Sequence, residues 1–226
     1  MKRMLAISDI HGELELFDEL LEKVNYDAAE DQLILLGDYV DRGPDSKGVL
    51  ERVTELKQQG AIVLRGNHDQ MMLETAMGEL GAKGSWARNG ALPTLQSYDS
   101  SIQDITLPAT ELFWEHVEFI KETGYYYETD DYVFVHAGVQ PGLPVQETDP
   151  FVLLWIREEF HQGYSGEKTV VFGHTPAFVL RGTRDYDVYF GDNRIIGIDG
   201  GAVYGGQLNC LELPGEKVYF VRKLSD

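Results

Sequence analysis

The chain has 226 residues, 43% hydrophobic and 25% charged, which excludes a fibrous or wholly disordered protein. Its 38 acidic residues against 19 basic ones leave a net charge of −19, which disfavours binding long nucleic acids or anionic membranes through the general surface. The one cysteine, Cys210, excludes an internal disulfide bond. No apolar run approaches the roughly 18 residues of a membrane span or forms a secretory signal, so a cytoplasmic protein is predicted.

Strands and helices are predicted to alternate in the first third of the chain. Short apolar strands and amphipathic helices follow one another at residues 3–8, 13–24, 32–36, 46–59, 61–64 and 70–77. The run 32–36 is typical of a strand buried on both faces, and Ser46 is the predicted N-cap of the helix that it begins. This β-α-β-α-β-α order predicts a parallel sheet with right-handed crossovers.

The alternation stops after residue 77. Glycines, prolines and a polar run indicate an irregular, cap-like insertion at residues 78–108. Beyond it, helices are predicted at 109–122 and 149–160, and strands at 125–128, 132–136, 169–172, 195–198, 207–213 and 217–221. Because no linker or internal repeat interrupts the chain, a single domain spanning residues 1–226 is expected.

Chemically active side chains follow five of the predicted strands. The segments are SDIHG (8–12), GDYVDRG (37–43), RGNHD (65–69), HAG (136–138) and GHTP (173–176). Ligands of open α/β sheets bind beyond the carboxyl ends of the strands, so these segments are expected to share one rim. Asp9 and His11 would point the same way if their strand stayed extended, and a carboxylate with an imidazole suits a borderline divalent ion. Asp38 could bridge that ion to a second one.

Each motif by itself also has a structural explanation. Asn67 could cap the following helix, His174 could be a hydrogen-bonded turn residue, and Asp41 with Arg42 could form a surface ion pair. The joint occurrence of five such motifs at five strand ends favours a functional site. Two further histidines follow no strand and are expected to be structural: His116 and His161.

Taken in order, the motifs resemble the signature of the phosphoprotein phosphatase family of dinuclear metallophosphoesterases, GDxHG, GDxVDRG, GNHE, HAG and GH. The resemblance runs from Asp9 to the closing segment IGIDGGAVYGGQLNCLEL. It implies an α/β protein with the calcineurin-like fold, a central β-sandwich flanked by helices in αββα layers. Two positions depart from the signature: Ser8 replaces its first glycine, and Asp69 replaces the usual glutamate with a shorter carboxylate.

The resemblance implies a centre of two divalent metal ions. Asp38 would hold both ions, and the full set of implied ligands is Asp9, His11, Asp38, Asn67, His136 and His174. The first two would serve one ion and the last three the other. Mn²⁺ is expected from the family, although imidazole and carboxylate ligands also admit Fe, Zn or Ni. Two such ions outweigh two carboxylates, so the site would attract a phosphate dianion even in an acidic protein.

Four more residues receive catalytic or substrate-binding roles from the resemblance. His68 would be the general acid that protonates the leaving group, oriented by Asp41. Arg42 would bind phosphate oxygens, and Arg157, in a stretch similar to the family's WxR segment, would bind them as well. Attack on phosphorus would come from a hydroxide that bridges the metals.

Several functions remain open at this stage. The stretches RGNHDQMM, FGHTP and IDGGAVYGG resemble bacterial and phage protein phosphatases, which favours hydrolysis of phosphoserine and phosphothreonine in proteins. HAGVQP and GGQLNCL resemble symmetrical diadenosine tetraphosphate hydrolases, the alternative. Residues 78–108 and 139–165 flank the motifs and are predicted to form the walls that select between these substrates. A non-catalytic metal-binding module is a lesser alternative, and the lack of a basic stripe argues against a nuclease.

Overall fold

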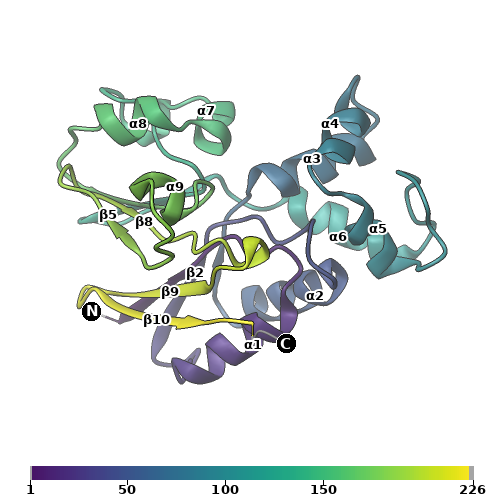
Figure 1. The fold of residues 1–226 in the computed structure, drawn as a ribbon, viewed down its shortest axis with the longest axis horizontal. Helices are drawn as coiled ribbons and strands as arrows, with labels where there is room; N and C mark the ends of the chain where they lie inside the picture. Colours follow the sequence, from purple (N-terminus) through teal and green to yellow (C-terminus); the bar gives the residue numbers. More distant parts are fainter. Residues whose placement is uncertain (1, 224–226) are drawn as a thin grey trace.

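Two five-stranded sheets form the centre of the computed structural model, which describes residues 2–223 (Figure 1). The strands are β1 (Arg3–Ile7), β2 (Asp31–Leu35), β3 (Ile62–Val63), β4 (Tyr126–Glu128), β5 (Tyr132–Val135), β6 (Thr169–Phe172), β7 (Tyr189–Phe190), β8 (Ile195–Gly197), β9 (Leu208–Leu213) and β10 (Lys217–Val221). One sheet has the order β10-β9-β1-β2-β3 and the other β4-β5-β6-β8-β7. The predicted domain limits, Met1 and Asp226, lie outside the described residues.

Each sheet has a parallel centre and antiparallel additions. β1, β2 and β3 are parallel neighbours, which confirms the arrangement predicted from the alternating order, whereas β9 runs antiparallel to β1 and pairs with β10. In the second sheet β5, β6 and β8 are parallel, with antiparallel β4 and β7 at the two edges. The carboxyl ends of the three parallel strands in each sheet therefore lie at a common edge.

Alternation of side chains along the strands builds three apolar layers. On β1, Leu5 and Ile7 pack with the helices on one side, whereas Ala6 faces the second sheet. On β6, Val171 faces the first sheet, and Phe172 packs with the helices beyond the second sheet. Since both faces of both sheets are covered, the predicted αββα sandwich is confirmed.

The helices are distributed over the two outer faces and one end of the sandwich. They are α1 (Leu14–Lys23), α2 (Ser46–Gln58), α3 (Asn67–Ala76), α4 (Ala82–Arg88), α5 (Leu92–Tyr98), α6 (Glu111–Lys121), α7 (Pro150–Trp155), α8 (Glu158–Gly163) and α9 (Ala177–Arg181), with 3₁₀ turns η1 (Val145–Glu147) and η2 (Ala202–Tyr204). Figure 1 shows α1 and α2 below the first sheet, and α7 and α8 above the second. Within residues 2–223, none of these helices has the length and apolarity needed to cross a membrane.

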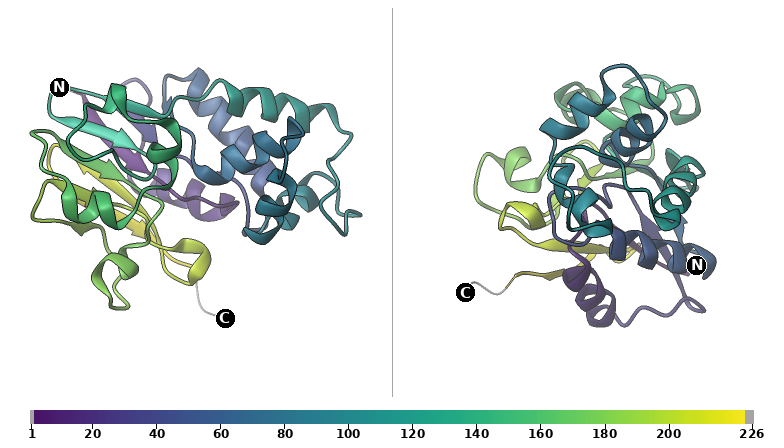
Figure 2. Two further views of the ribbon diagram at one scale, coloured as in Figure 1. Left: turned by 90° about the horizontal axis from the view of Figure 1, so that it is seen from above. Right: turned by 90° about the vertical axis from the view of Figure 1, so that its right-hand side faces the viewer.

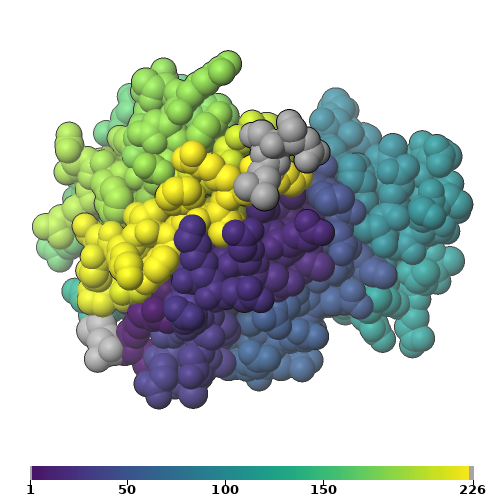
Figure 3. All heavy atoms as spheres, turned by 60° about the horizontal axis from the view of Figure 1, so that its bottom comes forward, coloured from purple at the N-terminus to yellow at the C-terminus, as the bar shows by residue number. Residues whose placement is uncertain are grey.

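Helices α3 to α6 form a lobe at one end of the sandwich, extending away from the sheets (Figure 2). On the surface in Figure 3, the first strand and helix lie beside the C-terminal hairpin. A hydrogen bond from Lys23 Nζ of α1 to the carbonyl oxygen of Phe220 in β10, 2.6 Å long, joins them there. The chain thus returns to its starting sheet after building the second one.

The structure corrects three local predictions. Residues 78–108 hold two short helices, α4 and α5, rather than a wholly irregular insertion, because Pro93 starts α5 at a position that needs no backbone donor. Asp45, not Ser46, caps α2, since the Asp45 side chain accepts the Gly48 N–H at 2.8 Å. The helix predicted at 149–160 breaks into α7 and α8 at Arg157, whose φ of −134° and ψ of −109° are not helical.

Candidate active site

All six predicted metal ligands are buried and gather at the carboxyl ends of the strands. Two follow β1, one follows β2, one begins α3 after β3, one follows β5 and one follows β6; in order they are Asp9, His11, Asp38, Asn67, His136 and His174. His116 and His161 lie elsewhere. His116 Nδ1 is hydrogen-bonded to the Tyr98 hydroxyl, and His161 stacks on Phe172.

Asp9 and His11 reach the site by a route that differs from the prediction. Strand β1 ends at Ile7, and the two residues have φ of 55° and 47°, so they are not extended. Such left-handed conformations cost a non-glycine residue roughly 1–2 kcal/mol. Backbone hydrogen bonds across to the loop after β2 hold them, from Asp9 N to Gly37 O at 3.1 Å and from His11 N to Asp38 O at 2.9 Å. The directions of the Asp9 and His11 side chains are thus set by a tight loop, not by the alternation of side chains along an extended strand.

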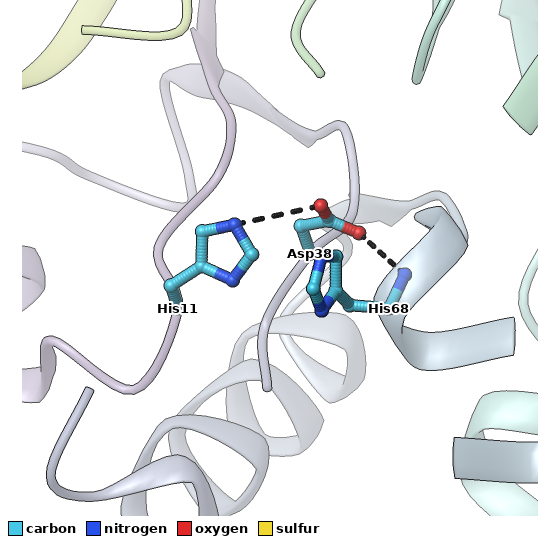
Figure 4. Close-up of side chains that lie close together, drawn as sticks. All are labelled: His11, Asp38 and His68. Atoms are coloured by element: carbon cyan, nitrogen blue, oxygen red, sulfur yellow. Dashed lines mark hydrogen bonds and ion pairs between the residues drawn. The ribbon is translucent and has the colours of Figure 1, made fainter. Parts of the chain in front are cut away.

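Asp38 lies between two groups of candidate ligand atoms. Its Oδ2 is 3.5 Å from His11 Nε2, and its Oδ1 is 3.5 Å from His136 Nε2 (Figure 4 shows the His11 side). Oδ1 also accepts the backbone N–H of His68 at 2.9 Å. A side chain on Gly66 would collide with this carboxylate, because a Cβ there would lie 2.1 Å from Oδ1. From this position one carboxylate can contact two cations.

The second group of ligand atoms fits a divalent cation. The Nδ1–H of His136 donates to the Leu36 carbonyl at 2.9 Å, which leaves a lone pair on Nε2, 2.9 Å from Asn67 Oδ1. That amide oxygen lies 2.8 Å from His174 Nδ1, and His174 Nε2 is buried without a hydrogen-bond partner among residues 2–223. Lone pairs that face one another repel unless a cation lies between them, and this donor set suits Mn, Fe, Zn or Ni. The residues present therefore fit a metal ion.

A positive charge faces the first group of ligand atoms. His11 donates from Nδ1 to the Val40 carbonyl at 2.8 Å, so its Nε2 accepts from the Arg42 guanidinium at 2.7 Å. The same guanidinium donates to His68 Nε2 at 2.8 Å. Burial lowers the pKa of His11 well below its ordinary value, and the neighbouring His68 and Arg42 lower it further. Both imidazoles are thus neutral groups whose lone pairs point at one cationic position.

His68 and Asp41 form a buried pair. His68 Nδ1 lies 2.6 Å from Asp41 Oδ2, which directs the Nε2 atom of the ring toward the pocket. Burial raises the pKa of Asp41 to about 7, while hydrogen bonds from Thr94 and Trp86 act in the opposite direction. Burial, followed by the positive charge of Arg42, lowers the pKa of His68 well below its ordinary value. The pair has the geometry of an imidazole oriented by a carboxylate.

A pocket of about 100 Å³ opens beside these groups. Arg157 projects into it from the break between α7 and α8 and donates to Thr175 Oγ1 at 2.8 Å. Its remaining wall comes from several elements: Asp38, Arg42, Asn67, His68, Asn89, Trp155, His174, Pro176, Asp199 and Tyr204. The predicted phosphate-binding residues, Arg42 and Arg157, therefore share one pocket.

Asp199 is a residue of the site that the sequence analysis missed. It is 4% exposed and lines the pocket, and its pKa is raised well above the ordinary value by burial and by the nearby Asp9 carboxylate. It follows β8 just as the predicted residues follow their strands, so the strand-end rule could have found it. Asn89, Trp155 and Tyr204 stand at no strand end; Trp155 belongs to the WxR segment and Tyr204 to the stretch IDGGAVYGG, whereas no motif contains Asn89.

The shorter carboxylate at position 69 organises the loop that carries Asp38. Asp69 accepts the backbone N–H groups of Gly66 and Asp38, both at 2.8 Å, and that of Tyr39 at 3.0 Å. Three such hydrogen bonds offset the cost of burying a carboxylate. Asp69 thus fixes the backbone on either side of the shared ligand without entering the pocket itself.

An αββα sandwich with two overlapping groups of candidate metal ligands, beside two arginines that line one pocket, is the architecture of a metallophosphoesterase. The chain belongs to the calcineurin-like phosphoesterase family, whose sequence profile matches residues 2–210. This membership confirms the predicted family, the fold class and a hydrolase activity.

Named proteins similar to the chain divide between two activities. It is 31% identical to serine/threonine-protein phosphatase 1 of Salmonella typhimurium over 94% of its own length and 92% of that protein. It is 32% identical to the symmetrical bis(5'-nucleosyl)-tetraphosphatase of Nitrosomonas europaea over 63% of its length, and the matched part is about half, 47%, of that protein. Its fold resembles a crystal structure of a candidate diadenosine tetraphosphatase, with a TM-score of 0.73, 24% identity, and coverage of 100% of this chain and 95% of that one.

Proposed function

We propose that this metallophosphoesterase hydrolyses phosphomonoesters, with phosphoserine and phosphothreonine residues of cytoplasmic proteins as its substrates. The observation that carries the proposal is the position of Asp38 between two groups of ligand atoms, beside Arg42, Arg157 and His68. Bound divalent ions, expected to be Mn²⁺, would polarise phosphate oxygens and activate water near neutral pH. The residues that would hold the two ions are Asp9, His11, Asp38, Asn67, His136 and His174.

The two arginines would bind the phosphate group. The Arg157 guanidinium donates one hydrogen bond to Thr175, and its other N–H groups face the pocket. The Arg42 guanidinium donates one hydrogen bond to His11 Nε2 and one to His68 Nε2. An arriving phosphate dianion is a stronger partner for a guanidinium than a neutral imidazole, because both partners are charged. Because the Nε2 lone pair of His11 would be used in holding a metal ion, Arg42 would be released from that ring, and phosphate binding is expected to draw Arg42 away from His68 as well.

His68 would then protonate the leaving group. Withdrawal of Arg42 leaves His68 Nε2 facing the pocket, where it can carry a proton to the leaving oxygen. The Asp41 carboxylate, 2.6 Å from Nδ1, would stabilise the protonated ring and keep it in this orientation. General acid catalysis of this kind contributes about 10²–10⁴-fold to a rate.

Two observations favour a protein as the substrate. The pocket, about 100 Å³ in volume, accommodates a phosphate group and leaves the rest of a substrate on the surface, as suits a side chain of a larger protein. The similarity to the serine/threonine phosphatase also extends over nearly all of both chains. A net charge of −19 disfavours long nucleic acids as substrates and anionic membranes as partners.

Cleavage of dinucleoside tetraphosphates is the second candidate function, and exposed aromatic rings beside the pocket favour it. Phe151 is 69% exposed and stacks on Trp155, with ring centroids 6.2 Å apart, and Trp155 contacts His174. Tyr204, also exposed, lies over the Arg42 guanidinium. Exposed aromatic rings beside a phosphate-binding pocket can stack on a nucleobase, an interaction worth about 1–3 kcal/mol per base.

Kinetics on a small set of substrates distinguish the candidates. With Mn²⁺ added, kcat/KM is measured for a phosphothreonine peptide, diadenosine tetraphosphate and p-nitrophenyl phosphate, using wild type, His68→Ala and Phe151→Ala. The expected result is a preference for the peptide, a loss of about 10²–10⁴-fold on the peptide in His68→Ala, and little effect of Phe151→Ala.

Other outcomes reject the proposal in different ways. A preference for the dinucleotide that Phe151→Ala removes would establish the second candidate. Equal activity of wild type and His68→Ala on the phosphothreonine peptide would exclude His68 as the general acid. Hydrolysis of none of the three substrates by the wild type would leave a metal-binding module without turnover.

A further inference from the structure

The Asp41 carboxylate receives its hydrogen bonds from the lobe as well as from His68. Trp86 Nε1 lies 2.9 Å from both Asp41 oxygens, and Thr94 Oγ1 donates to Oδ1 at 2.8 Å. Asp41, Trp86 and Thr94 are all fully buried. Two of the three side chains that hold this carboxylate therefore come from α4 and α5, in the segment expected to act only as a substrate-selecting wall.

The lobe also supports the backbone of the same loop. Asp41 and Arg42 are consecutive non-glycine residues with φ of 75° and 70°, a conformation that such residues rarely adopt. The N–H of Asp41 donates to Thr94 Oγ1 at 2.8 Å, and that of Arg42 donates to the Gly90 carbonyl at 3.1 Å. Position 90 must lack a side chain, since a Cβ there would lie 3.0 Å from Arg42 Cγ.

The hydroxyl of Thr94 is fully used in this arrangement. It accepts the Asp41 N–H, donates its own proton to Asp41 Oδ1, and lies 3.0 Å from Ser46 Oγ, which can donate to it. Valine has the same shape without the hydroxyl, and would leave the buried N–H with Ser46 Oγ, 3.1 Å away, as its partner. Serine keeps the hydroxyl and lacks only a methyl group. Position 94 thus offers a matched pair of variants.

We propose that Thr94 and Trp86 are positioning residues that orient Asp41, and through it His68, for protonation of the leaving group; the inference rests on the proposed role of His68. With one oxygen held by Thr94 and both contacted by Trp86, the Asp41 carboxylate cannot rotate about its bond to Cβ. The imidazole bonded to Oδ2 is consequently kept with Nε2 toward the pocket. Two residues of the lobe, Trp86 and Thr94, therefore position the imidazole that is proposed to act as the general acid.

Leaving-group dependence tests this inference. Protonation matters little for p-nitrophenolate, a weak base, and matters much for phenolate, a stronger one. For Thr94→Val with Mn²⁺, kcat on phenyl phosphate is expected to fall about tenfold further than kcat on p-nitrophenyl phosphate, with KM nearly unchanged. Thr94→Ser should recover most of the loss, and Trp86→Phe should resemble Thr94→Val. Gln96→Ala, which removes from the same helix a side chain that donates to the Ile102 carbonyl, should leave the ratio of the p-nitrophenyl phosphate rate to the phenyl phosphate rate unchanged.

His68→Asn separates failure of this inference from failure of the proposed function. The relevant ratio is kcat on p-nitrophenyl phosphate divided by kcat on phenyl phosphate. If His68→Asn raises this ratio and Thr94→Val does not, the positioning role is wrong and the general-acid role of His68 is retained. If neither variant changes the ratio, or if wild type hydrolyses neither ester, the proposed role of His68 is wrong, and the positioning role that depends on it is wrong too. Equal losses in Thr94→Ser and Thr94→Val would also overturn the inference, because the hydroxyl would then be irrelevant.

A spectroscopic measurement gives an answer that does not depend on activity. The Nδ1 proton of an imidazole bonded to a carboxylate resonates far downfield in the ¹H NMR spectrum, and its loss in His68→Asn assigns it. In metal-free protein, this resonance is expected to persist in Thr94→Ser and to shift or broaden in Thr94→Val. An unchanged resonance in Thr94→Val would show that the hydroxyl does not position the pair.

Discussion

Replacing Asp38 by asparagine is expected to stabilise the metal-free protein while weakening its metal binding. Asparagine keeps an oxygen to accept the His68 N–H but removes the charge. In the folded protein, burial and then the Asp9 and Asp69 carboxylates raise the pKa of Asp38 well above its ordinary value. When the pKa of a carboxyl is higher in the folded than in the unfolded state, the free energy of unfolding falls as pH rises from the unfolded toward the folded pKa. The stabilisation by asparagine should therefore increase from acidic to alkaline pH.

The size of the gain follows from the geometry. Asp9 Oδ1 and Asp38 Oδ2 lie 4.0 and 3.5 Å from the same atom, His11 Nε2, so they are at most about 7.5 Å apart. At an effective dielectric constant of about 20, two unit charges at that separation repel by about 2 kcal/mol. The free energy of unfolding of the Asp38→Asn variant without metal is therefore expected to exceed that of wild type by about 2 kcal/mol at pH 8.

Urea unfolding with EDTA and with Mn²⁺ measures both effects. At a Mn²⁺ concentration a hundred times the dissociation constant, each wild-type site should add about 2.7 kcal/mol, most of which the variant should lose. Asp69→Asn is the matched control. Burial also raises the pKa of this carboxyl, to about 7, but it accepts three backbone N–H groups that an amide could not all satisfy, so asparagine there should stabilise the metal-free protein less than asparagine at position 38 does.

Two results would refute this reasoning. If the metal-free Asp38→Asn protein were less stable than wild type, the Asp38 carboxylate would stabilise the fold instead of destabilising it through charge repulsion. Retention of two metal ions per chain by the variant, measured by elemental analysis, would show that Asp38 is not shared between two sites.

Three further predictions concern residues around and outside the site. Burial, and then Lys47, lowers the pKa of His116 to about 4. The unfolded state therefore takes up a proton before the folded state does as pH falls below about 6.5. In urea titrations, the free energy of unfolding of wild type should fall by about 3 kcal/mol between neutral pH and pH 4 through this residue, a loss that His116→Gln should not show. Arg157→Ala should raise KM about 10–100-fold with unchanged metal content, and loss of metal would make Arg157 structural. Cys210, fully buried with a raised pKa, should resist alkylation by iodoacetamide until the protein unfolds; modification of the native protein would contradict its place in the core.

Local patterns in the sequence were sufficient to predict the described strands of both sheets except β7, together with the candidate ligands at their ends. Residues 33–36 and 170–172 are apolar throughout, because strands buried between two layers meet no water on either face. Asp38 and His136 follow such strands directly, and parallel strands bring their carboxyl ends to one edge. The resemblance to a known family then supplied the roles of these residues.

Tertiary structure alone decided what surrounds those ligands. The left-handed turns at Asp9 and His11 depend on backbone hydrogen bonds to another loop, and no local pattern encodes them. Trp86 and Thr94 lie in a segment with no chemical motif, and only packing of α4 and α5 brings them to Asp41. Periodicity in a sequence reports burial along one element, whereas contacts between distant elements depend on how the whole chain packs. The sequence therefore determined which groups are candidates for the chemistry, and the packed structure decided which groups contact them.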